Sequence, residues 1–212
     1  MLHRLPSLSL LTLALAATLA GCATAPTTPS ATAPAQTAPA QDKATRLTAL
    51  YEQYWEEQLK LNPLAATFQG DPRYNDQLPN FFSAEYRAQA RAFTERWLRT
   101  IESVGSEGLD GQDLLSYEIF VRDAKLSLEG ERFPGWQQPI NQFYNFAAMA
   151  VQLGSGTGAQ PFKTVQDYDN WRKRGARMPE LFDQSIANSR VGMQSGVVQP
   201  RALMVKVLPP LD

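Results

Sequence analysis

Residues 84–103 read AEYRAQARAFTERWLRTIES, and this stretch decides the fold class. Its apolar side chains recur every three or four residues, the spacing that places them on one face of an α-helix. The arginines fall on the other faces and alternate with glutamates, which is typical of a helix side in contact with water. Ser83 is a good N-cap for this helix, and Gly105 follows its end. The apolar face consists of Tyr86, Ala90, Phe93, Trp97 and Ile101.

The same spacing predicts further helices on both sides of this stretch. No convincing two-residue alternation of the kind that marks a β-strand occurs, and no internal repeat is evident. The predicted fold class is therefore all-α, a multi-helix array of about five to seven helices. The other predicted helices are residues 43–61, a helix from Asp110 to Gly130, residues 141–153, a helix capped by Thr164, one after Pro179, and a last one from Pro200 to about residue 208.

Two of these helices have apolar residues beyond a single narrow stripe. In the helix after Asp110, the inner stripe consists of Leu114, Tyr117, Val121, Ala124 and Leu128, and Ile119, Phe120 and Leu126 widen it. In the helix after Thr164, we expect Val165, Tyr168, Trp171 and Arg172 to point the same way.

The first 21 residues have the layout of a secretory signal. Arg4 supplies a positive charge, residues 5–19 are mostly apolar, and small residues precede Cys22. Residues 19–22, Leu-Ala-Gly-Cys, resemble the lipobox of bacterial lipoproteins, in which the signal is cut before the cysteine and the cysteine is acylated. By this resemblance residues 1–21 are a lipoprotein signal peptide and Cys22 carries a lipid anchor. The alternatives are a plain signal peptide with an incidental cysteine, and a short hydrophobic anchor.

The lipobox resemblance also predicts a location. In lipoproteins of Gram-negative bacteria, a residue other than aspartate after the lipid site implies sorting to the outer membrane, and Ala23 stands there. We therefore expect a cell-envelope protein that faces the periplasm, with the membrane as its partner through Cys22. Residues 22–42 are rich in Ala, Thr and Pro and predict a disordered linker. Residues 43–212 are long enough to form the helical domain.

The composition leaves few options for catalysis. The formal net charge is −1, without the clustered basic excess of a nucleic-acid-binding protein. His3 is the only histidine and Cys22 the only cysteine, and we expect signal removal and acylation to take both away. Zinc sites and Ser-His-Asp or Cys-His nucleophiles depend on these side chains. We therefore predict no catalytic, cofactor-binding or metal-binding residue in the chain.

Two carboxylate pairs remain as candidates for acid–base chemistry. Glu52 and Glu56 are one helical turn apart, and Asp167 and Asp169 lie on either side of Tyr168. We interpret the glutamates as part of a solvated helix face and Asp167 as a residue that favours a helix start. The glycine-rich run 154–158 has neither the strand before it nor the Lys-Ser or Lys-Thr after it that a phosphate loop requires, so we interpret it as a flexible loop.

Several runs of the helical domain resemble a known family. They are YWE at 54–56, LNPLAAT at 61–67, GDPRYNDQLP at 70–79, PFKTVQDY at 161–168 with Trp171 after it, and GVVQPR at 196–201. Together they resemble the bacterial lipoprotein family called domain of unknown function 885. The resemblance covers most of residues 47–208. It rests on short sequence patterns, none of which is a catalytic motif.

The resemblance implies a larger, mostly helical protein. Full-length members look like zinc-dependent peptidases, and their His-Glu-x-x-Pro-Gly-His-His motif lies beyond the region matched here. Zinc and a peptide substrate are therefore implied for full-length members, and no position of this chain matches the motif. We expect Asp212 to end a fragment that is inactive alone, with an exposed apolar patch near residues 203–211. The alternative is a complete, non-enzymatic periplasmic binding or scaffold lipoprotein, and whether the chain is an enzyme stays open.

Overall fold

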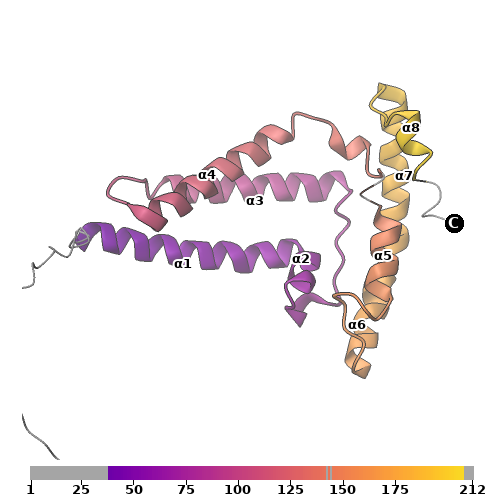
Figure 1. Ribbon diagram of the computed structural model, residues 1–212, viewed down its shortest axis with the longest axis horizontal. Coiled ribbons are helices and arrows are strands. Elements are labelled where there is room, and N and C mark those ends of the chain that lie inside the picture. Colours follow the sequence, from indigo (N-terminus) through magenta and orange to yellow (C-terminus); the bar gives the residue numbers. More distant parts are fainter. Residues whose placement is uncertain (1–37, 142, 144, 208–212) are drawn as a thin grey trace, which may run out of the picture. The chain divides into compact units, whose positions relative to one another are not determined.

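The computed structural model describes residues 38–141, 143 and 145–207, so the predicted signal peptide, Cys22 and most of the predicted linker lie outside this part. Within it the chain forms helices and no strand, which confirms the all-α prediction. The helices are α1 (Ala38–Leu61), α2 (Pro63–Phe68), α3 (Ala84–Glu102), α4 (Gly111–Gly130), α5 (Phe146–Gly154), α6 (Val165–Gly175), α7 (Met178–Ser195) and α8 (Arg201–Met204), with the 3-10 helices η1 (Pro72–Tyr74) and η2 (Gly135–Gln137) (Figure 1).

Local capping explains where α3 and α6 begin. The Ser83 hydroxyl accepts a hydrogen bond from the Tyr86 backbone N–H at 3.1 Å, as predicted for the start of α3. At α6, the Thr164 hydroxyl accepts from the Asp167 N–H, and the Asp167 carboxylate accepts from the Thr164 N–H. This reciprocal capping box satisfies backbone donors that the first turn leaves free.

Helices α1, α3 and α4 share one apolar core. Helix α3 packs against both α1 and α4, and Figure 1 shows α1 and α3 side by side. Leu47, Ile101 and Leu109 are buried in this core, with Tyr51, Tyr117 and Val121 packed around them. Trp97 is also buried, and its indole N–H donates to the Glu57 carboxylate at 3.2 Å. Glu57 therefore turns toward α3, although its sequence neighbours Glu52 and Glu56 suggested a solvated position.

A second core joins α2, α5, α6 and α7 with the segment between α2 and α3. Its buried residues are Leu64, Leu78, Phe146, Leu153 and Leu181, and Phe81, Phe82, Met149, Trp171, Met178 and Phe182 pack against them. The Asn188 amide of α7 donates to the Phe82 carbonyl at 2.9 Å, so α7 is tied to the chain entering α3.

Helix α7 comes unusually close to η2 near its end. A Cβ atom on Gly192 would lie 2.6 Å from the Val197 carbonyl oxygen and 2.7 Å from the Gln137 carbonyl oxygen. Only glycine fits at this contact without a shift of backbone. Gly196, with φ of 79°, then ends α7 in the left-handed conformation.

Three helix boundaries differ from the sequence-based predictions. Helix α1 begins at Ala38, inside the predicted linker, and its early proline is tolerated because the first turn needs no N–H donor. Helix α5 begins at Phe146 rather than at residue 141, because the Asn145 side chain caps it by accepting from the Ala147 N–H. Helix α8 ends at Met204, since the chain continues in i→i+3 hydrogen bonds to Leu203 and Met204 carbonyls.

Candidate functional site

The carboxylates singled out in the sequence do not come together. Glu52 is exposed on α1, whereas Glu56 binds Arg73 through both oxygens at 2.7 and 3.0 Å. Asp167 caps α6, and Asp169 is exposed with the Arg172 guanidinium 3.7 Å away. In each pair, therefore, one carboxylate has an ordinary structural role and the other is exposed. The run 154–158 begins at the last residue of helix α5 and continues in turns and bends, with no strand before it in the described part, as its interpretation as a loop requires.

The Arg73 guanidinium links α1 to the turn before η1. It binds Glu56 and Asp71 together, with the shortest contact to Asp71 at 2.6 Å. The hydrogen bonds from Arg73 lower the pKa of the Glu56 and Asp71 carboxyls, and the two carboxylates raise the pKa of Arg73. All three groups stay charged near neutral pH, so this cluster supports the turn and supplies no acid or base.

A buried arginine, Arg174 of α6, forms the second polar cluster. Its Nε–H donates to the Gln77 carbonyl at 3.1 Å, and its Nη2 donates to the Tyr74 carbonyl at 2.8 Å and to Thr67 Oγ1 at 2.9 Å. Its Nη1 donates to Gln160 Oε1 at 2.5 Å. The side chain is fully buried. One guanidinium therefore holds α2, the segment after η1 and the segment before α6 against one another.

Burial lowers the pKa of Arg174 to about 10, and the Asp76 carboxylate opposes this shift. The guanidinium is still charged at neutral pH, and its ligands are carbonyl, amide and hydroxyl oxygens rather than a carboxylate. Such a charge is tolerated in the interior only while its donors are hydrogen-bonded. The geometry points to a structural role, because the donors of Arg174 are directed at fixed acceptors of the chain itself.

The sequence did not predict this cluster. Val165 and Tyr168 were expected to point the same way as Trp171, but they are 81% and 60% exposed, whereas Trp171 packs against the second core. Arg172 was expected with them and is exposed too, whereas Arg174 turns inward. Since residues 172–174 are all basic, no signal in the sequence separates the buried arginine from its neighbours.

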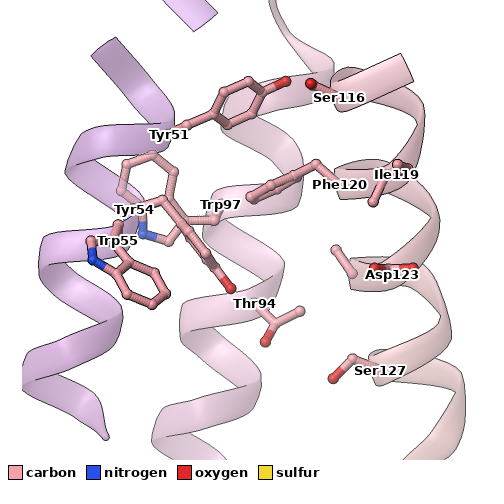
Figure 2. A pocket seen from close by; sticks show the side chains of 11 residues that line it. Tyr51, Tyr54, Trp55, Thr94, Trp97, Ser116, Ile119, Phe120, Asp123 and Ser127 are labelled. Carbon is pink, nitrogen blue, oxygen red and sulfur yellow. The ribbon is translucent and has the colours of Figure 1, made fainter. Parts of the chain in front are cut away.

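A pocket of about 540 Å³ lies between α1 and α4, over α3. Figure 2 shows Tyr51, Tyr54 and Trp55 of α1 on one side, and Ile119 and Phe120 of α4 on the other. Its lining residues are Tyr51, Tyr54, Trp55, Thr94, Trp97, Ser116, Ile119, Phe120, Asp123, Ala124 and Ser127. The volume and the lining, in which five aromatic rings stand beside a few polar groups, are those of small-molecule sites.

Ring contacts join the α1, α3 and α4 sides of this pocket. Tyr54 meets Phe120 edge-on with ring centroids 4.9 Å apart, and it meets Trp97 edge-on at 5.7 Å. Tyr51 lies 5.6 Å from Phe120. Burial raises the pKa of Tyr54 and is the main reason that the pKa of Tyr51 is raised, so both hydroxyls are neutral at neutral pH. Sequence periodicity placed Trp97 and Phe120 on apolar helix faces and did not predict the pocket.

The described residues contain no group of three or more His, Cys, Asp or Glu side chains positioned to hold a metal ion. Their donor set does not fit the zinc that the family resemblance implies for full-length members. None of the helices in the described part is both long enough and apolar enough to cross a membrane.

Comparison with known families identifies the family of this chain. A family described as "Bacterial protein of unknown function (DUF885)" matches residues 63–212. The chain belongs to this family. The match confirms the family predicted from the sequence runs, and it includes the Arg174 cluster and all of α4. No curated protein and no solved structure matches the chain significantly.

Proposed function

We propose that this DUF885 protein is a lipoprotein anchored at Cys22 in the cell envelope, facing the periplasm, and that its helices are the N-terminal supporting portion of a peptidase-like protein. In this role the chain is inactive alone, since the His-Glu motif of full-length members is absent from its sequence. It holds and positions a catalytic portion without supplying zinc ligands.

Helix α4 carries this proposal. None of its residues is buried, although one of its faces packs on α3. On another side, Leu115 is 48%, Ile119 41% and Leu126 57% exposed. A helix with apolar residues on two sides is expected to be covered on both, as in the interior of a larger helical protein. Met204 and Val205 at the last described turn are also exposed, while Val207 is buried. The exposed pair supports the expected apolar patch only in part.

The DNA after codon 212 tests the supporting role. We expect an open frame, in some phase, that encodes the His-Glu motif. As the biochemical counterpart, the purified processed protein should hold no stoichiometric zinc by elemental analysis and should not cleave fluorogenic peptides. Stoichiometric zinc with peptide cleavage by this chain alone would refute the proposal.

Metabolic labelling tests the anchor separately. Cells that express the chain are grown with an alkyne-tagged palmitate, and the labelled protein is detected in the membrane fraction. Cys22→Ser should abolish the label, and Ser30→Ala in the predicted linker should keep it. Equal labelling of the Cys22→Ser variant would contradict the lipobox assignment.

The pocket between α1 and α4 favours a second candidate, a non-enzymatic binding lipoprotein of the periplasm. A preformed aromatic pocket with a few polar groups is an arrangement that binds small ligands. In this second candidate function, the exposed apolar face of α4 lies beside a ligand site and is not covered by another part of a larger protein.

A further inference from the structure

We propose that the pocket between α1 and α4 binds an organic cation with an apolar body, such as a guanidinium or a quaternary ammonium attached to an aromatic group. This inference rests on the second candidate function, the binding lipoprotein, and names its ligand class. It does not depend on acylation of Cys22 or on a peptidase role.

The walls of the pocket supply the apolar part of the site. The Tyr54 and Phe120 rings meet edge-on in its wall, and Trp55, which is 45% exposed, also lines it. Figure 2 shows the Trp55 ring on the α1 side, facing the opening between α1 and α4. Aromatic rings in such positions attract an apolar group by burial of its surface and a cation by their π faces.

Other aromatic rings of the chain already hold cations. Arg87 lies over the Trp136 ring at 4.5 Å, and Arg96 lies over the Phe93 and Trp97 rings. Among the described residues, no arginine or lysine lies over Tyr54, Trp55 or Phe120. The α1 and α4 walls of the pocket therefore present ring faces that no cation of the described part uses.

One carboxylate gives the pocket its charge. Asp123 is the sole ionised side chain in its lining, beside the hydroxyls of Thr94, Ser116 and Ser127. The ion-pair partner of Asp123 is Arg122, its neighbour in sequence, and both side chains are more than half exposed. An exposed pair of this kind is weak, so a ligand cation can replace Arg122 at small cost.

The Tyr51 hydroxyl adds a polar group to the pocket lining. It is buried, and it has no hydrogen-bond partner among the described residues. Figure 2 shows it directed toward Ser116 of α4. An unpaired buried hydroxyl is unfavourable, and a ligand that offers a donor or acceptor here would satisfy it.

Titration calorimetry on the processed full chain in a non-ionic detergent tests the proposal. The peptide probe is N-acetyl-Phe-Arg amide, and its matched neutral control has citrulline in place of the arginine. The second probe, benzyltrimethylammonium, represents a free organic cation. Tighter binding of the arginine peptide than of the citrulline peptide identifies a peptide side chain as the ligand. Binding of benzyltrimethylammonium alone identifies a small cation. Failure of both cations to bind overturns the proposal.

Two variants locate the binding in this pocket. Asp123→Asn should weaken cation binding about fivefold, the strength of a charge pair about 4 Å apart in water. Glu118→Gln removes the same charge from an exposed position of α4 outside the lining, and should leave affinity unchanged. Trp55→Leu should weaken binding by about two- to fivefold. Circular dichroism must show all three variants folded. Equal affinity of folded Asp123→Asn and wild type, or equal binding of the citrulline control, would overturn the inference while leaving Cys22 labelling unaffected.

Discussion

Thr67→Val isolates the contribution of the Arg174 cluster to stability. The Thr67 hydroxyl accepts from Arg174 Nη2 at 2.9 Å and lies 2.7 Å from Asn75 Oδ1, and Thr67 is 3% exposed. Valine keeps nearly the same shape and removes only this hydroxyl. The substitution leaves one N–H donor of the Arg174 guanidinium and the Asn75 amide oxygen without this partner. Both groups are buried, so water does not replace the lost hydrogen bonds.

The expected loss follows from these two contacts. A hydrogen bond to a charged group contributes about 1.5–3 kcal/mol and a neutral one about 0.5–1.5 kcal/mol. The free energy of unfolding should therefore fall by about 2–4 kcal/mol. The measurement is urea denaturation of the processed protein followed by far-UV circular dichroism, with the slope compared between variants to confirm the same transition.

Thr48→Val provides the matched control. The Thr48 hydroxyl donates to the Ala44 carbonyl, four residues earlier, at 3.1 Å, just as the Thr67 hydroxyl lies 3.2 Å from the Pro63 carbonyl, but Thr48 is exposed and contacts no arginine in the described part. Its substitution should change stability by less than about 0.5 kcal/mol, as for most surface positions. If Thr67→Val and Thr48→Val lower the free energy of unfolding equally, the buried cluster does not stabilise the fold as argued.

Two further predictions concern packing and pH. Gly192→Ala should destabilise the protein by about 1–3 kcal/mol, because its Cβ would meet backbone oxygens; Gly175→Ala, where no atom lies within 4 Å, should be neutral or stabilising in the same thermal melts. Glu56 and Asp71 have pKa values below the ordinary 4.5 and 3.8 because of Arg73, so the stability they add is present at neutral pH and is lost as the pH falls through their lowered values. Denaturation midpoints from about pH 6 to about pH 3 should fall less steeply for Glu56→Gln than for wild type, and parallel curves would contradict this linkage.

The sequence predicted the elements that depend on local signals. Helix α3 follows from its apolar spacing and from Ser83, which caps it as predicted. Thr164 and Asp167 likewise form a capping box, which is a local signal for the start of α6. These signals operate within a few residues, so periodicity and capping rules suffice to find them.

Long-range contacts account for what the sequence did not predict. Arg174 is held in the interior by acceptors that are distant in sequence. Most of them lie 97 to 107 residues earlier in the chain, and Gln160 lies 14 residues earlier. Likewise, α4 has apolar residues on more than one side, and only the position of α1 and α3 decides that the exposed Ile119 lines a pocket while the exposed Leu126 does not. A periodic pattern gives the width of an apolar face and leaves open which part of it a neighbour covers.

The distance in sequence between Arg174 and its acceptors has a consequence for synthesis of the protein. The carbonyls of Tyr74 and Gln77 emerge from the ribosome about 100 residues before the guanidinium that binds them. Until then the two carbonyls stay hydrated. The chain between them and Arg174 loses its conformational entropy only when α6 docks. This half of the molecule therefore completes its folding after translation has passed α6, whereas the pairing of α3 with α4 can form earlier from neighbouring segments.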